Sequence, residues 1–349
     1  MSQGRHHRIG LALGSGSARG WAHIGVIRTL AEAGIVPDVV AGSSIGAAVG
    51  AAWCAGRLDS YETFARSLDR RQVWSYFDLS FRGGLIKGRK VFDFAHADIP
   101  DLAIEDLERS FTAVAVDVEL GREVWLRRGR LLDCLRASAA IPGIVTPVNI
   151  DGRWLIDGGV LNPVPVNVCR AMGATLVIAV DLNTHLGQRS LRAEAPEPAA
   201  AAAPPVPPPV EAPAERSWQA AMREMATELQ QWVRGDPARA KEERPPSMFE
   251  VMGATIDIMS MRISRGRLGG DPPDMLIAPR LPDITMFDFH RADEAIAEGR
   301  RATLHALASA PVEFDFAREG RSLVLAPDDL GPALAPLTLE GPPGRDGDG

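Results

Sequence analysis

The stretch at residues 39–46 reads VVAGSSIG and decides the fold class of this chain. Three apolar residues lead into a G-x-S-x-G pentapeptide whose central serine is Ser44, and an alanine-rich segment follows at once. This order predicts a buried strand, a sharp turn and a helix. Such a turn lifts the oxygen of its central serine above the edge of a sheet, next to the N-terminus of the helix.

The residues before this stretch complete a strand–helix–strand unit. The apolar run at 9–13 predicts a buried first strand, and the apolar periodicity at 21–33 predicts a helix that ends before Gly34. The run at 36–41 predicts the next strand. Two strands joined by a helix predict parallel pairing with a right-handed crossover.

The alternation of strands and helices continues to about residue 185. Strands are predicted at 111–118, 123–127, 154–156 and 175–180, and a helix at 131–139. We therefore expect a three-layer α/β/α fold with a mostly parallel central sheet. The predicted parts of the chain are a catalytic α/β core at 8–190, a Pro/Ala-rich linker at 191–215, helical segments and a late strand of the same domain at 216–320, and a disordered tail at 327–349.

Composition excludes several classes of protein. The 349 residues carry a formal net charge of -7, so nucleic acid is not an expected partner. The three cysteines, Cys54, Cys134 and Cys169, match no zinc spacing and suggest no disulfide framework. We expect no metal and no organic cofactor. The short apolar run near the N-terminus does not resemble a secretory signal, so the expected location is cytoplasmic, with peripheral membrane contact left open.

A second small-residue loop separates the first strand from the first helix. At a helix N-terminus, its backbone N–H groups can face a phosphate or the oxyanion of an acyl transition state. It lacks the Gly-Lys-Ser/Thr ending of a P-loop, but Asp38, about 20 positions on, leaves a dinucleotide site open. The serine turn after the next strand favours the oxyanion role. The loop comprises Gly14, Ser15, Gly16, Ser17, Ala18, Arg19 and Gly20.

A third element, Asp157-Gly158-Gly159, follows a short predicted strand. An Asp-Gly pair alone is common in turns. The three elements in this order, however, resemble the patatin-like phospholipases, and the resemblance extends to 11–30, 137–142, 154–165 and 274–298. The elements are the 14–20 loop, the turn of Gly42, Ser43, Ser44 and Gly46, and the aspartate motif of Asp157, Gly158 and Gly159.

The resemblance implies a Ser–Asp dyad that works without histidine. Ser44 would be the nucleophile, Asp157 the base, and the backbone of residues 16–18 the oxyanion hole, while Arg19 matches the basic residue of that loop. The substrate would be a lipid acyl ester such as a phospholipid or lysophospholipid. One departure matters, because patatins carry three consecutive glycines where this loop reads Ser15-Gly16-Ser17.

Several alternatives remain open at this level. A Ser–His–Asp triad would draw on His185, His290 or His305, whereas His23 suits a structural helix position. A regulatory or scaffold protein could keep the fold without meaningful turnover, and a nucleotide-binding protein could use the 14–20 loop. The aromatic-rich stretch 74–94 suits either an acyl pocket or core. The amphipathic segment 217–233 suits either a mobile lipid-facing helix or a helix packed on the domain.

Overall fold

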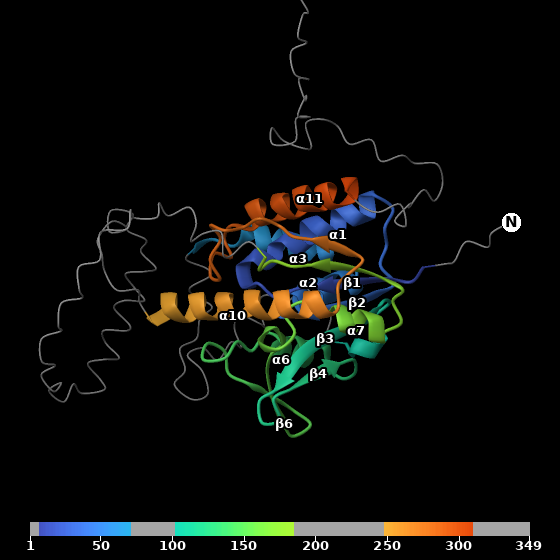
Figure 1. Ribbon diagram of the computed structural model, residues 1–349. Coiled ribbons are helices and arrows are strands. Elements are labelled where there is room, and N and C mark those ends of the chain that lie inside the picture. The colour runs from blue at the N-terminus through green and yellow to red at the C-terminus, as the bar shows by residue number, and fades with distance from the viewer. Residues whose placement is uncertain (1–6, 71–101, 185–247, 310–349) are drawn as a thin grey trace, which may run out of the picture.

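The structure, a computed structural model, describes residues 7–70, 102–184 and 248–309. Its centre is an eight-stranded sheet (Figure 1). Within this sheet a run of neighbouring strands, in the order β8–β7–β1–β2–β3, pairs in parallel throughout. These strands are β1 (Ile9–Leu13), β2 (Val39–Ser43), β3 (Ser110–Asp117), β7 (Leu176–Val180) and β8 (Met275–Ile277).

The end of the sheet beyond β2 is antiparallel. β4 (Arg122–Leu126) and β6 (Arg153–Asp157) both pair with β3, and β5 (Val148–Ile150) pairs with β6. β4 pairs with residues 113–117 of β3, a stretch that also pairs with β2 and with β6. β4 therefore occupies one edge of β3, and β2 and β6 share the other edge.

The register along this shared edge positions the candidate site. Ser43, the last residue of β2, lies opposite Val114, and Asp157, the last residue of β6, lies opposite Ala115. β6 therefore occupies the edge of β3 where β2 leaves it. The two strands run toward each other and both end at this point, so the residue after Ser43 emerges beside Asp157.

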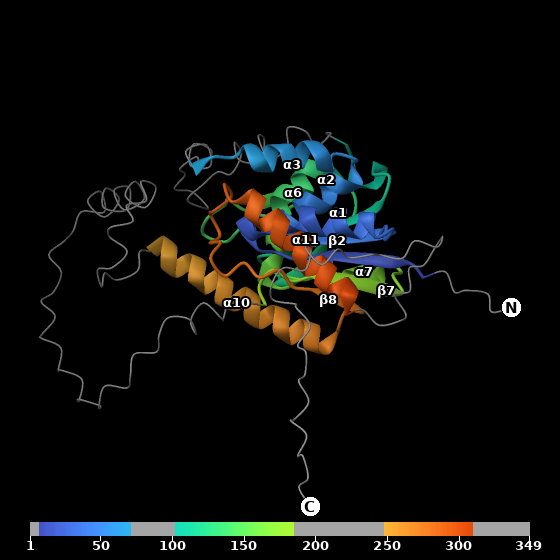
Figure 2. The same ribbon diagram turned by 90° about the horizontal axis from the view of Figure 1, so that it is seen from above.

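Helices cover both faces of the sheet (Figure 2). In β1, Leu11 and Leu13 belong to the larger apolar core on one face, whereas Ala12 belongs to the core on the other. The period of two expected for a buried strand is thus present, and the predicted three-layer α/β/α class is confirmed. One face carries α1 (Ala22–Glu32), α2 (Ile45–Cys54), α3 (Leu58–Ser67), α6 (Leu131–Ser138) and α11 (Ala292–Ala308), and the other carries α7 (Val166–Ala171) and α10 (Met248–Gly270).

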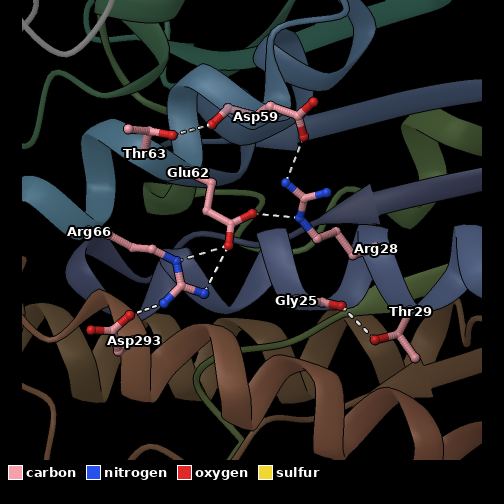
Figure 3. Close-up of polar contacts among 8 residues, drawn as sticks. All are labelled: Gly25, Arg28, Thr29, Asp59, Glu62, Thr63, Arg66 and Asp293. Atoms are coloured by element: carbon pink, nitrogen blue, oxygen red, sulfur yellow. Dashed lines mark hydrogen bonds and ion pairs between the residues drawn. The ribbon is translucent and has the colours of Figure 1, made fainter.

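Ion pairs connect α1, α3 and α11 at the surface of the larger layer (Figure 3). Arg28 of α1 contacts Glu62 of α3 at 2.5 Å, and Glu62 also contacts Arg66 at 2.8 Å. Arg66 in turn pairs with Asp293 of α11. The arginines are partly exposed, so these pairs add little stability. They link three helices on the side of the sheet away from α10.

The predicted parallel pairing of the first two strands is confirmed. The helix predicted at 21–33 is shorter, because Ser17–Trp21 forms a 3-10 turn before α1 begins. Within the parts of the chain that the structure describes, no helix combines the length and the apolar character needed to cross a membrane. The predictions for the linker at 191–215, the segments 74–94 and 217–233 and the tail at 327–349 all lie outside the described residues.

Candidate active site

Ser44 occupies a strained turn between β2 and α2. Its φ of 56° and ψ of -125° are rare for a residue with a side chain, and such a conformation costs about 1–3 kcal/mol. Glycine on the C-terminal side makes the turn possible: a Cβ atom at Gly46 would lie 2.3 Å from the carbonyl oxygen of Leu13. The G-x-S-x-G sequence therefore forms the predicted sharp turn, here called the elbow, with Ser44 directly before the first residue of α2.

A second serine holds the backbone of the elbow in place. The N–H of Ser44 donates to Ser138 Oγ at 3.1 Å, and Ser138 Oγ donates to the carbonyl oxygen of Val114 at 2.6 Å. Ser138 is the last residue of α6 and is fully buried. This chain of bonds ties the elbow to β3, the strand that also positions Asp157.

Asp157 meets Ser44 directly. Ser44 Oγ donates to Asp157 Oδ2 at 2.5 Å, and the other carboxylate oxygen, Oδ1, accepts from the N–H of Gly159 at 2.7 Å. Gly158 is required here, since a Cβ atom would lie 2.3 Å from the carbonyl oxygen of Val114. The side chains of Ser44 and Asp157 come from residues 113 positions apart and are each only 5% exposed.

Burial changes the acidity of the aspartate. Removal from water raises the pKa of Asp157 from 3.8 to about 6, although the hydrogen bonds from Ser44 and Gly159 act in the opposite direction. A carboxylate with this pKa is still ionised at neutral pH, and it is a stronger base than an ordinary exposed aspartate. The arrangement can therefore take a proton from the serine hydroxyl.

The 14–20 loop lies beside the dyad, because a Cβ atom at Gly159 would approach Ser15 Oγ to 2.8 Å. The first two amides of the loop are already used: the N–H of Gly14 donates to Val180 and the N–H of Ser15 to Pro163, at 3.0 and 2.8 Å. His23 Nε2 contacts the carbonyl oxygen of Gly14 at 2.8 Å.

The remaining donors of the loop are fewer than the sequence suggested. The N–H of Ala18 donates to the carbonyl oxygen of Met286 at 3.3 Å. Within the described residues, the amides of Gly16 and Ser17 make no hydrogen bond to the protein. Ser17 has a φ of 49°, which turns the backbone at this point. Gly16 and Ser17 are thus the loop amides that a ligand oxygen can use.

The guanidinium group of Arg19 pairs with a carboxylate of α10. Its Nη2 lies 2.6 Å from Asp257 Oδ1, and its Nη1 donates to the carbonyl oxygen of Ile284 at 3.4 Å. The arginine side chain is 3% exposed and that of Asp257 24%. The basic residue of the loop therefore attaches the loop to a helix 238 positions further along the chain.

No described histidine contacts the dyad. His23 is completely buried, which lowers its pKa to about 4, and since a carbonyl oxygen only accepts, its Nε2 carries the proton donated to Gly14. His290 lies just before α11 and His305 lies near its end. The carboxylate of Asp157 accepts from Ser44 and Gly159 and not from either histidine. His185 lies outside the described residues.

The position of Asp38 argues against a dinucleotide site in the 14–20 loop. Asp38 lies before β2, and its carboxylate accepts from the N–H of Ile9 at 2.7 Å. Ile9 begins β1, whereas the 14–20 loop follows the end of β1. Asp38 is therefore at the opposite edge of the sheet from the loop and cannot bind a ribose held there.

Known proteins resemble this chain over most of its length. Residues 11–170 match the patatin-like phospholipase family. An uncharacterized NTE family protein of Mycobacterium tuberculosis is 38% identical over 344 residues, which covers 88% of this chain and 93% of that protein. The chain belongs to the patatin-like phospholipase family, and membership indicates lipid hydrolase activity in general.

Further relatives place the chain within this family. Neuropathy target esterase sws of Drosophila melanogaster is 34% identical over 184 residues, which is 51% of this chain but 13% of that protein. Among solved structures, VipD from Legionella pneumophila aligns with a TM-score of 0.40 at 14% identity, covering 87% of this chain and 67% of that chain. By its relatives, the chain is an NTE family member of the patatin-like phospholipases.

The sequence did not reveal the roles of two residues that support the site, Ser138 and Asp257. Ser138 falls within the stretch 137–142 that resembles the family, but no local pattern assigns it a role, because that role depends on the end of α6 meeting the turn at Ser44. Asp257 lies on a helix after a long interval of chain and has no local pattern that links it to Arg19. The strand before Asp157 was recognised, but its antiparallel pairing on the same edge of β3 as β2 was not.

Proposed function

We propose that the protein is a serine esterase that hydrolyses lipid acyl esters, with Ser44 as nucleophile and Asp157 as base. The observation that carries the proposal is the buried 2.5 Å hydrogen bond from Ser44 Oγ to Asp157 Oδ2. A nucleophile within hydrogen-bond reach of a base, with the base oriented by a third group, is the arrangement needed for covalent catalysis. Here the N–H of Gly159 is the orienting group.

In the first half of the reaction, Ser44 Oγ attacks the carbonyl carbon of the ester and its proton passes to Asp157. The bond to the leaving alcohol then breaks, and the alcohol takes the proton from Asp157. The product at this stage is an ester between Ser44 and the acyl group. The strained backbone at Ser44 holds its oxygen at the tip of the turn, against Asp157.

In the second half, water replaces the alcohol. Asp157 takes a proton from the water as it attacks the acyl-enzyme, and it returns that proton to Ser44 Oγ when the carboxylic acid leaves. Each half therefore uses Asp157 once as base and once as acid. A pKa of about 6 suits both roles near neutral pH, because the group is mostly ionised yet accepts a proton readily.

The negative charge that develops on the carbonyl oxygen requires donors. The amides of Gly16 and Ser17 support this role, because both belong to the loop beside the dyad and make no hydrogen bond to the described protein. The N-terminus of α2 begins at Ile45, immediately after the nucleophile, and contributes a favourable dipole. Removing one such donor typically slows catalysis about 100- to 1000-fold.

The two alternatives predict different behaviour. A nucleotide site in the 14–20 loop is disfavoured because Asp38, the acidic residue it would use, lies at the other end of β1 and accepts from the N–H of Ile9. A scaffold without turnover would not need a strained serine bonded to a buried carboxylate, since strain and burial both cost stability.

The decisive experiment is reaction with a fluorophosphonate probe, followed by mass spectrometric mapping of the modified residue. We expect one adduct on Ser44 and matching loss of p-nitrophenyl ester hydrolysis. Labelling at another serine, or hydrolysis that persists after complete modification of Ser44, would overturn the assignment. A folded protein that neither labels nor hydrolyses any ester in the series from acetate to dodecanoate would favour the scaffold alternative.

A further inference from the structure

A small apolar cluster lies apart from the two main cores, next to the dyad. Ile144 and Met286 are buried within it, and the side chains of Met252 and Ile256 of α10 pack against them. The cluster draws on the segment after α6, on α10 and on the segment before α11. Its other members are Ile141, Val145 and Phe287.

One side of this cluster continues directly from the residues that support the dyad. Ser138 accepts the N–H of Ser44, and the carbonyl oxygen of Ala140 accepts the N–H of Asp157 at 2.9 Å. Ile141 is the next residue, and a turn closed by the N–H of Ile144 bonded to the carbonyl of Ile141 holds both in the cluster.

The opposite side of the cluster supports the 14–20 loop. The carbonyl oxygen of Met286 accepts the N–H of Ala18, and that of Ile284 accepts from Arg19. The side chain of Met286 belongs to the cluster. Apolar side chains of this cluster therefore lie between the backbone that accepts the N–H of Asp157 and the backbone that accepts the N–H of Ala18.

α10 closes the cluster from outside. A Cβ atom at Gly143 would lie 3.5 Å from Met252 Sδ, and one at Gly253 would lie 3.1 Å from Met286 Sδ. Asp257, one residue after Ile256, holds the helix against the loop through its ion pair with Arg19. The neighbouring Val251 faces the other way and is 48% exposed.

An acyl chain attached to a carbonyl at Ser44 needs apolar surroundings close to the dyad. Burial is worth about 0.8 kcal/mol for each methylene group. Methionine suits such a site, since its flexible thioether adapts to chains of different shape. Ser44 and Asp157 are 5% exposed, so a chain that reaches them must pass between the elements that surround them.

We propose that this cluster is the acyl-chain site and that Met252, Ile256 and Ile144 set the chain length the enzyme accepts. The inference rests on the proposed esterase activity. The acyl chain of the substrate lies between α10 and the segment at 141–145. It takes the space that the side chains of Met252, Ile256 and Ile144 fill when no substrate is bound. Side-chain volume at the three positions then limits how many carbons fit.

The test measures kcat/KM for p-nitrophenyl acetate and octanoate in the full-length protein. Met252→Trp fills the site, and the octanoate-to-acetate ratio should fall at least about tenfold, which corresponds to the exclusion of about two methylene groups. Ile256→Ala opens the site, and the preferred ester in a series from acetate to dodecanoate should become longer by about two carbons.

Val251→Trp and Val251→Ala are the matched controls. They make equivalent changes on the outward side of the same helix, and the chain-length profile should stay that of the wild type. If Met252→Trp does not fold, as judged by thermal melting, Ile256→Ala decides the question with a smaller change.

The outcomes separate the two proposals. A wild-type protein that hydrolyses no ester and does not label at Ser44 fails at the level of the esterase activity. A wild-type protein that is active, with Met252→Trp or Ile256→Ala leaving the profile unchanged, overturns the acyl-chain site alone. A shift of equal size in the Val251 variants would also overturn it, because the effect would then belong to the helix as a whole.

Discussion

Two parts of the site are held in place in different ways: the Ser44–Asp157 dyad, and the part of α10 that packs over the apolar cluster through Met252 and Ile256, here called the cover. Ser44 and Asp157 follow the ends of two strands on one edge of β3, so backbone pairing determines their separation. In the described part of the chain, by contrast, α10 meets the site through side chains, namely the Arg19–Asp257 pair and the apolar cluster. Side-chain contacts tolerate substitution and rearrangement far more readily than sheet register does.

This difference suggests a division of labour. The sheet holds the reacting groups at a separation of 2.5 Å, which catalysis requires and which small shifts would damage. In the proposed acyl-chain site, the cover would face the variable part of a lipid, where volume and apolar character matter more than exact position. Changes at the dyad should therefore alter the rate by orders of magnitude, and changes at the cover should alter selectivity.

The largest effect should follow Ser44→Ala. Loss of the nucleophile should lower kcat for a soluble ester by at least about 10⁴-fold, as expected when a covalent mechanism is removed. Ser67→Ala, an exposed serine at the end of α3, is the matched control and should keep wild-type rates. Retained hydrolysis by pure, folded Ser44→Ala protein would place the nucleophile elsewhere.

Asp157→Asn should follow, with a loss of about 10³-fold, because the amide cannot accept the serine proton. The matched substitutions are His185→Ala, His290→Ala and His305→Ala, each of which should cost less than about tenfold. Measurement of kcat/KM on one soluble ester compares all four variants. A histidine variant as inactive as Asp157→Asn would establish a triad and would remove the dyad interpretation.

The pH dependence should report the same carboxylate. With the pKa of Asp157 raised to about 6 by burial, the base is protonated at low pH. The value of kcat/KM should be about tenfold lower at pH 5 than on a plateau above pH 7, with a slope of one below the midpoint. A plateau that extends down to pH 4.5 would mean that the base titrates like an exposed aspartate, against the structure.

Ser44 and Asp157 could be predicted from the sequence because each lies in a local motif. The elbow needs glycine at fixed positions around Ser44, and Asp157 needs Gly158 because of the close approach to Val114. Those demands act on adjacent residues and so leave a motif. The buried strands were likewise recognisable from short apolar runs, and the strands predicted at 111–118 and 123–127 lie close to the observed bounds of β3 and β4.

Long-range contacts explain what the sequence did not disclose. Ser138 reaches Ser44 across 94 residues and Arg19 reaches Asp257 across 238. Neither pair lies within one element, so no periodicity connects its members. The assignment of Ala18 to the oxyanion hole came from its place in the loop, and only tertiary structure shows that its amide is bonded to Met286.

Ser138→Ala should have a moderate effect, between those of the dyad and the cover. The substitution leaves the buried N–H of Ser44 without its acceptor, and a lost hydrogen bond of this kind costs about 1–3 kcal/mol. We expect kcat and the rate of fluorophosphonate labelling to fall about tenfold with little change in KM. Partial recovery in Ser138→Thr, which restores a hydroxyl, would distinguish positioning of the elbow from general loss of stability.

The smallest effect should appear in stability rather than rate, and its sign follows from linkage. The folded-state pKa of Asp157 lies above the unfolded value, so the folded protein binds more protons between about pH 4 and 6. Stability from this group is therefore present at low pH and is lost as the pH rises through that window. Above pH 6 the wild type carries the full cost of a buried charge.

Asp157→Asn removes that charge without changing the shape of the side chain. At pH 8 the variant should be more stable than the wild type by about 1–3 kcal/mol, and at pH 4 the difference should shrink to about 0.5 kcal/mol. Denaturant unfolding at both pH values measures it, and Asp257→Asn provides a contrast, since it should destabilise by leaving Arg19 buried without its partner. If Asp157→Asn is less stable than the wild type at pH 8, the carboxylate contributes more through its hydrogen bonds than burial costs it. The contact between Ser44 and Asp157 would then stabilise the fold, as the Arg19–Asp257 pair of the cover does, and the contrast in stability between the two regions would be lost.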